Sequence, residues 1–123
     1  MKATLLAGLA ILALATAVHA AEFDLSPEQP ARLKAEPNQE AIAAIPADFK
    51  FAAEGKFTVA VSPWDPPIAT YATDGQTVVG ADPDLASLIA DSLGLELNLV
   101  ATAWADWPLG VTSGKYDAVI SNV

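Results

Sequence analysis

Small polar side chains that could hold a ligand stand at the ends of two predicted strands. Ser62 follows a strand predicted over 57–61, and Ser121 and Asn122 lie at the end of another over 117–121. Hydroxyl and amide groups there can bind a ligand's ammonium or carboxylate, although simple capping of the strand ends is the alternative. Open α/β sheets bind ligands just beyond the carboxyl ends of their strands, so we carry the binding hypothesis forward.

Aromatic rings gather in the same stretches. Trp64, Trp104 and Trp107 lie in the predicted loops, and Tyr71 lies in a nearby hairpin. Aromatic faces beside Asp65 suit a small ligand that has an apolar part and a cationic group. Each ring could instead pack on the edge of the sheet, but the clustering of several rings favours a cleft. The predicted ligand-binding residues are therefore Ser62, Trp64, Asp65, Tyr71, Trp107, Ser121 and Asn122, with Trp107 as the strongest ring because the second helix begins there.

The elements that would position these side chains alternate between strand and helix. An apolar, β-branched run predicts a buried strand over 57–61. Asp74-Gly75 predicts a hairpin between 68–72 and 77–79. Alternation predicts a strand over 95–99, and a third strand covers 117–121. This order indicates an α/β fold with a parallel sheet, whose loops 62–71, 101–107 and 121 onward meet at one edge.

Two helices are expected between these strands. Asp82 is the predicted N-cap of the first, with Pro83 at its first position and Gly94 after its end. Its apolar face is predicted to consist of Leu85, Leu88, Ile89 and Leu93. The second helix is short, opened by Asp106 and Pro108 and ended by Gly114.

The amino-terminal part reads as an export signal and a leader. Residues 1–20 have one lysine, an apolar run and small residues before a predicted cleavage after Ala20. An uncleaved anchor is the weaker alternative, because a spanning helix needs about 20 apolar residues. Residues 21–55 are a proline-interrupted leader, predicted to be partly ordered, with short helical turns over 26–29 and 39–45. These features predict a periplasmic protein.

Composition excludes several kinds of chemistry. The chain has no cysteine, so disulfides and thiolate sites are excluded, and its single histidine, His19, lies in the predicted signal. The formal net charge of −9 argues against nucleic acid as a partner. Nucleophile-elbow, phosphate-loop and dinucleotide motifs are absent. We therefore predict no catalytic residue, no metal site and no cofactor.

Residues 57–123 resemble the N-terminal lobe of the family 3 extracytoplasmic solute-binding proteins, the amino-acid receptors of ABC importers. The matching pieces, in order, are "FTVAVSPWDPPI", "DGQTVVGADPDLASLIADSLGLELNLV" and "WADWPLGVTSGKYDAVISNV". The resemblance implies two α/β lobes that close on an amino acid, an ABC permease as partner, and a monomer. It places Ser62 and Asp65 near the ligand amine or side chain, Trp107 at an apolar wall, and Ser121 and Asn122 near the ligand backbone groups.

The chain departs from this family at two positions. The family usually has aromatic residues where Asp65 and Ile68 stand, so Trp64 or Tyr71 is expected to supply the stacking ring. The family's carboxylate-binding arginine and second lobe are expected beyond Val123, which makes 56–123 the first part of a lobe. The prediction is a binding protein and not an enzyme. A periplasmic dehydratase, a cell-wall lytic enzyme or a sensor domain on the same lobe are the alternatives.

Overall fold

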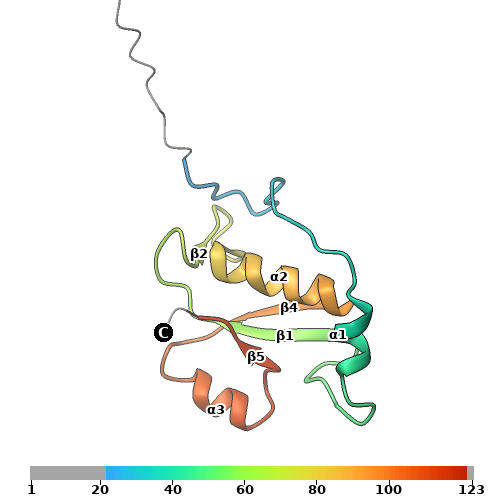
Figure 1. Ribbon diagram of the computed structural model, residues 1–123. Coiled ribbons are helices and arrows are strands. Elements are labelled where there is room, and N and C mark those ends of the chain that lie inside the picture. Colours follow the sequence, from blue (N-terminus) through green and yellow to red (C-terminus); the bar gives the residue numbers. More distant parts are fainter. Residues whose placement is uncertain (1–21, 122–123) are drawn as a thin grey trace, which may run out of the picture.

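The computed structural model describes residues 22–121. The predicted signal peptide, its cleavage site after Ala20, and Asn122 lie outside this range. Within it, no helix is long and apolar enough to cross a membrane. The described part is a mixed α/β structure with a parallel sheet and flanking helices (Figure 1), which confirms the predicted fold class.

The sheet contains three parallel strands in the order β4-β1-β5. They are β1 (Lys56–Val61), β4 (Glu96–Ala101) and β5 (Ala118–Val119). The central strand is buried from Phe57 to Val61, because it pairs on both sides and its apolar residues are covered on both faces. The third strand is shorter than predicted, although Asp117 and Ile120 still donate backbone hydrogen bonds to β1.

A two-stranded hairpin follows the first loop, as predicted. It pairs β2 (Thr70–Tyr71) with β3 (Val78–Val79) in antiparallel register. The Asp74 carboxylate accepts hydrogen bonds from the Thr77 hydroxyl at 2.6 Å and from the backbone amides of Gln76 and Thr77 at 2.9 Å. These bonds, first the one from the Thr77 hydroxyl, lower the pKa of Asp74. The turn is therefore fixed by its own side chains.

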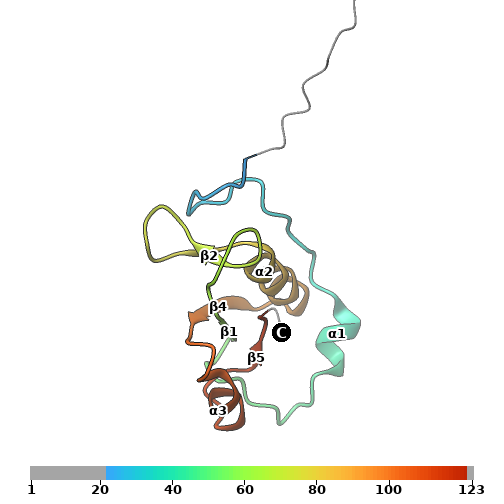
Figure 2. The same cartoon turned by 90° about the vertical axis from the view of Figure 1, so that its left-hand side faces the viewer.

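The helices α2 (Ala81–Leu93) and α3 (Trp107–Thr112) cover opposite faces of the sheet (Figure 2). The predicted N-cap of α2 at Asp82 is wrong, because the cap is Gly80 and no side chain caps this end. The amides of Ala81 and Asp82 instead donate to the carbonyls of Pro67 and Ile68, both at 3.0 Å. The preceding loop thus takes the place of a capping side chain.

The buried face of α2 also differs from the predicted leucine face. Its buried residues are Pro83, Ala86, Ser87 and Ala90, whereas Leu85 is 49% exposed. Ile89 and Leu93 do pack against the core formed with Phe57 and Val59, as expected. The small alanines let the helix approach the sheet closely, and the larger residues fill the sides of this contact.

The leader runs along the outer side of α2 and contains α1 (Gln39–Ala44), a helix predicted over 39–45 (Figure 1). Arg32 pairs with Asp84 at 2.8 Å and donates to the Ser87 hydroxyl at 3.1 Å. The backbone amide of Asn38 donates to the carbonyl of Ser92 at 2.8 Å, and the Asn38 side chain caps α1. These contacts attach the segment to the body of the fold.

Candidate functional site

A cavity of about 560 Å³ lies beyond the carboxyl ends of the three parallel strands. We call it the strand-end cavity. Its walls come from the loop after β1, the start of α2, the loop after β4 and Ser121, two residues after β5. The lining residues are Ser62, Pro63, Trp64, Asp65, Ile68, Ala69, Asp82, Thr102, Ala103, Trp104 and Ser121. Parallel strands bring their exits to one edge, so the cavity lies where the topology places a ligand site.

Hydrogen bonds join the three strand exits at the base of the cavity. The backbone amide of Ser62 donates to the Ser121 hydroxyl oxygen at 2.9 Å, which links β1 to β5. The amide of Thr102 donates to the Val61 carbonyl at 2.9 Å, which links β4 to β1. The Ser62 hydroxyl itself is buried and has no hydrogen-bond partner among the described residues. A polar group bound nearby would supply that partner.

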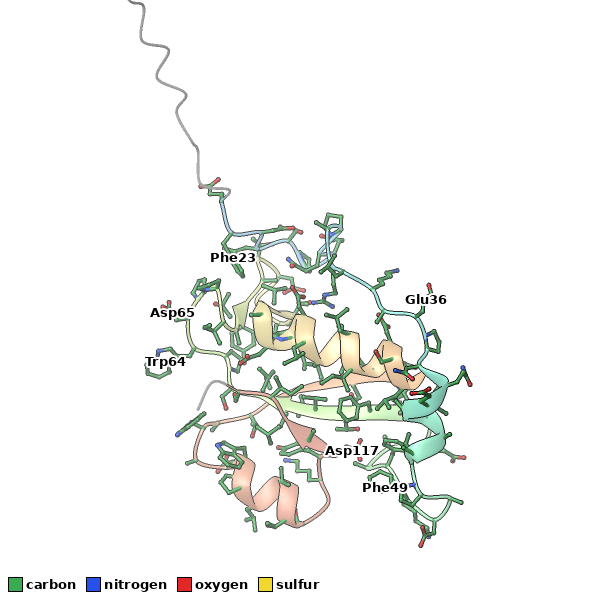
Figure 3. All side chains as sticks on the ribbon, viewed as in Figure 1. Phe23, Glu36, Phe49, Trp64, Asp65 and Asp117 are labelled. Carbon is green, nitrogen blue, oxygen red and sulfur yellow. The ribbon has the colours of Figure 1, made fainter. Side chains whose placement is uncertain are left out.

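The loop after β1 holds its shape through its own backbone. The amide of Trp64 donates to the Ala69 carbonyl at 2.8 Å, and the amide of Ile68 donates to the Asp65 carbonyl at 3.1 Å. Trp64 is 92% exposed as a result, and Asp65 is also exposed. Figure 3 shows both side chains at the end of the molecule opposite Phe49. The loop therefore presents an aromatic face and a carboxylate together.

The structure separates the aromatic candidates. Trp104 lines the cavity, and Trp107 does not. The rings of the two residues meet edge to face, with centroids 6.2 Å apart and planes at 67°. Tyr71, in β2, also lies outside the lining and is 47% exposed. Of the seven predicted site residues, the cavity thus brings together Ser62, Trp64, Asp65 and Ser121.

Three polar or aromatic lining residues, Asp82, Thr102 and Trp104, were not among the predicted site residues. Thr102 follows β4 directly, so the strand-end argument applied to Ser62 would have found it. The sequence favours Trp107 because the second helix begins there, and Trp107 is indeed the first residue of α3, but it is Trp104, in the loop before that helix, that lines the cavity. Asp82 had been interpreted as a helix cap, and the role of the loop carbonyls at that helix end is visible only in three dimensions.

Thr102 is held in place from below by Tyr116. The Tyr116 hydroxyl donates to the Thr102 hydroxyl oxygen at 3.3 Å, and Tyr116 is only 4% exposed. This hydrogen bond, followed by one with Lys115, lowers the pKa of Tyr116. The ring lies so close to Gly110 in α3 that any side chain there would collide with it. The packing of α3 on the sheet thus positions a lining hydroxyl.

The groups around the cavity are suited to binding. Hydroxyls, carboxylates and aromatic rings can together hold a polar solute with an apolar part. Among residues 22–121 there is no group of three acidic or histidine side chains that could hold a metal ion.

Comparisons with known proteins agree with this geometry. The model of the bacterial extracellular solute-binding proteins, family 3, matches residues 57–123. The arginine-bound form of domain 1 of TmArgBP, the ArgBP of T. maritima, is 33% identical with a TM-score of 0.53. A putative ABC-transporter binding component from Wolinella succinogenes, complexed with lysine, is 32% identical with a TM-score of 0.54. An ancestral cyclohexadienyl dehydratase is 29% identical with a TM-score of 0.52. A comparison with curated protein sequences gave no match.

The matched region is a part of these proteins. The alignments cover 56%, 58% and 56% of this chain, respectively. They span 54% of the T. maritima domain, 30% of the W. succinogenes protein and 28% of the ancestral dehydratase. The chain thus spans about half of an isolated domain 1.

Proposed function

Because this chain belongs to the bacterial extracellular solute-binding proteins of family 3, we propose that it forms part of a periplasmic receptor of an ABC-type importer. Its solute is an amino acid or a similar small polar molecule. The observation that carries the proposal is the strand-end cavity, which combines the hydroxyls of Ser62, Thr102 and Ser121 with the ring of Trp104. Arginine-bound and lysine-bound proteins among the similar structures support the solute class.

The mechanism is capture without a chemical step. The solute enters the strand-end cavity, and its polar groups bond to the hydroxyls while its apolar part lies on the aromatic ring. A second lobe then closes over it by a hinge motion, and the closed receptor docks on the permease as a monomer. Periplasmic location, through cleavage after Ala20, belongs to the same proposal. Asn122, which follows Ser121, is placed at the solute's backbone groups.

An enzyme is the second candidate, favoured by the similarity to an ancestral cyclohexadienyl dehydratase. A dehydratase requires a group that accepts or donates a proton at the bound substrate. Incubation of the purified protein with a cyclohexadienyl acid, followed by chromatography, would show an aromatic product if this candidate is right. A receptor returns the acid unchanged.

The test of the receptor is a calorimetric titration of the chain with each amino acid in turn, together with mass spectrometry of small molecules that co-purify with it. Replacement of Trp104 by Ala is expected to weaken binding of the best solute about tenfold, because one wall of the cavity is lost. Replacement of Trp107, which touches Trp104 by its edge, is expected to weaken binding less. Binding that neither change affects would count against this cavity as the site.

A further inference from the structure

The leader, residues 22–55, lies outside the part of the chain that matches the family, which begins at residue 57. It nevertheless runs along the whole of α2 (Figure 1). Three polar side chains of that helix bond to it, those of Asp84, Ser87 and Asp91. Their spacing of three and four residues places them in one stripe, while the alanines of α2 pack on the sheet. The helix therefore has one side for the core and another for the leader.

Arg32 makes the central contact with this stripe. Its Nε donates to the Asp84 carboxylate at 2.8 Å, and its Nη1 donates to the Ser87 hydroxyl oxygen at 3.1 Å. Ser87 is buried, and the Arg32 side chain is 27% exposed, so the bonds are partly shielded from water. Charge-assisted hydrogen bonds of this kind are stronger than neutral ones. Further along, the backbone amide of Ala35 donates to the Asp91 carboxylate at 3.2 Å.

Apolar burial contributes little to this attachment. Leu33, the neighbour of Arg32, is 74% exposed, and Phe23 and Leu25 are exposed as well. Two cavities, of about 250 and 200 Å³, adjoin Arg32, which lines both of them. Few apolar contacts and open space beside the polar ones allow the leader to detach locally while the sheet stays folded. The attachment therefore depends on polar contacts, with Arg32 at their centre.

The helix that Arg32 holds also forms a wall of the strand-end cavity. Asp82, two residues before Asp84, lines the cavity. The amides of Ala81 and Asp82 donate to the carbonyls of Pro67 and Ile68, both at 3.0 Å. These carbonyls belong to the loop after β1, which lines the cavity as well. The first turn of α2 thus joins the leader on one side to the cavity on the other.

The leader also holds the hairpin that follows this loop. The amide of Thr73 donates to the Leu25 carbonyl at 2.9 Å. At the far end, the amide of Asn38 donates to the Ser92 carbonyl, in the last turn of α2, at 2.8 Å. One continuous segment therefore bridges the hairpin and α2, the two elements that flank the cavity loop.

We propose that the leader is coupled to the strand-end cavity through α2, with Arg32 as the positioning residue. Arg32 is not among the described lining residues, but it fixes the first turn of α2, which positions Asp82 and the loop bonded to it. The inference rests on the proposed receptor function and adds a control of affinity to it. Coupling between two sites is reciprocal, so an attached leader strengthens solute binding and a bound solute strengthens leader attachment by the same factor.

The first experiment needs no solute. Arg32→Gln removes the charge that holds α2, and Lys34→Gln removes the same charge from an exposed position two residues along the leader, as the control. Hydrogen exchange of the Ala81 and Asp82 amides is expected to be about fivefold faster in Arg32→Gln and unchanged in Lys34→Gln. Equal exchange in Arg32→Gln and the unaltered chain would overturn the coupling, whatever the chain binds.

The second experiment measures affinity in the same variants. The probes are arginine and lysine, with which two of the similar structures are complexed, followed by the other amino acids, each titrated by calorimetry. Arg32→Gln is expected to weaken the tightest of them about fivefold, and Arg32→Lys, which keeps the charge, less. Unchanged affinity in Arg32→Gln would overturn the coupling and leave a solute receptor standing. Binding of no amino acid by the unaltered chain would overturn the receptor, while the exchange rates still decide whether Arg32 holds the wall.

A third experiment separates positioning from a purely structural contact. If Arg32 acts through α2, Arg32→Gln should add little to the loss of affinity in Asp84→Asn, and additive effects would overturn its assigned role. Saturation with the tightest amino acid should slow exchange of the Ala35 and Asn38 amides of the leader about fivefold. A purely structural contact would shift the urea denaturation midpoint of Arg32→Gln and leave both the affinity and these rates unchanged, which would contradict the proposal.

Discussion

The two ends of the parallel sheet use aspartate in opposite ways. At the amino end, the Asp117 carboxylate accepts the backbone amides of Ala52 and Thr58, both at 2.7 Å. At the carboxyl end, Asp65 and Asp82 line a cavity of about 560 Å³. A carboxylate bonded to two backbone amides is committed to the fold. A carboxylate on a cavity wall can contribute to recognition. The end of the sheet near which an aspartate lies therefore indicates its role.

The two ends differ less in what surrounds the charge. At the amino end lie α1 and two aromatic side chains, Phe49 and Phe51, whose rings meet edge to face with centroids 4.9 Å apart. Asp117 and Phe57 share an apolar pocket there with α1. At the carboxyl end, Trp64 is 92% exposed. Both ends have a pocket and an exposed aromatic side chain, so the difference between them lies in how their carboxylates are bonded.

The largest effect that tests this contrast is expected for Asp117→Ala. It removes both charge-assisted hydrogen bonds to the segment 52–58 and leaves a part-buried amide without an acceptor. We expect a loss of about 2 kcal/mol in the free energy of unfolding, measured by urea denaturation.

Asp65→Ala is the matched change at the other end, expected to alter stability by no more than about 0.5 kcal/mol. Equal destabilisation by the two variants would break the distinction between a structural and a recognition aspartate.

A smaller loss of stability is expected for Tyr116→Phe, which tests how firmly Thr102 is held at the carboxyl end of the sheet. The variant keeps the ring against Gly110 and loses only the hydrogen bond to the Thr102 hydroxyl. The melting temperature is expected to fall by about 4 °C or less. The affinities for charged and for neutral solutes should fall by a similar factor, since Thr102 is uncharged.

Tyr116→His keeps a ring that can form hydrogen bonds, but it is not expected to restore the bond to Thr102, because the imidazole is shorter than the phenol. Thr102→Val is the better comparison, since it removes the other partner of the same bond. If Tyr116→Phe weakens solute binding even when Thr102 is already valine, Tyr116 does not act through Thr102.

Much of the fold follows from the sequence, because local signals and packing agree over most of it. The β-branched run of β1, the Asp74-Gly75 turn and the strand–helix alternation predict the parallel sheet and its hairpin, and the structure confirms them. The start of α2 was predicted wrongly, because its first amides donate to the carbonyls of Pro67 and Ile68. These residues are far from the helix in the sequence, so no local pattern marks them as its cap. The exposed Leu85 shows that helical periodicity gives a face but not which residues of it meet the sheet.

The site was harder to predict than the fold. Strand ends are marked in the sequence, which is why Ser62 and Ser121 were predicted and do line the cavity. The direction in which a ring points depends on packing, so the sequence favoured Trp107 at the start of α3, whereas Trp104, whose ring centroid lies 6.2 Å from that of Trp107, lines the cavity. Whether these residues bind a solute stays a prediction.

The smallest effect on stability is expected for Asp74. This residue lies outside the cavity, in the hairpin between the first loop and α2, which both line the cavity, so it serves as a reference for the aspartates of the wall. Its pKa is lowered by the Thr77 hydroxyl and the amides of Gln76 and Thr77. A carboxyl with a lower pKa in the folded state adds stability above its unfolded pKa of about 3.9, and that stability is lost as the pH falls through the lower folded value. Asp74→Ala should therefore abolish this acid-dependent part of the hairpin's protection, followed by amide hydrogen exchange between pH 5 and pH 2 or so.

Solute selectivity should not change, because this carboxylate is engaged by its own turn, as Asp117 is by the sheet. A change of selectivity in Asp74→Ala would mean that a carboxylate outside the cavity also acts on the solute.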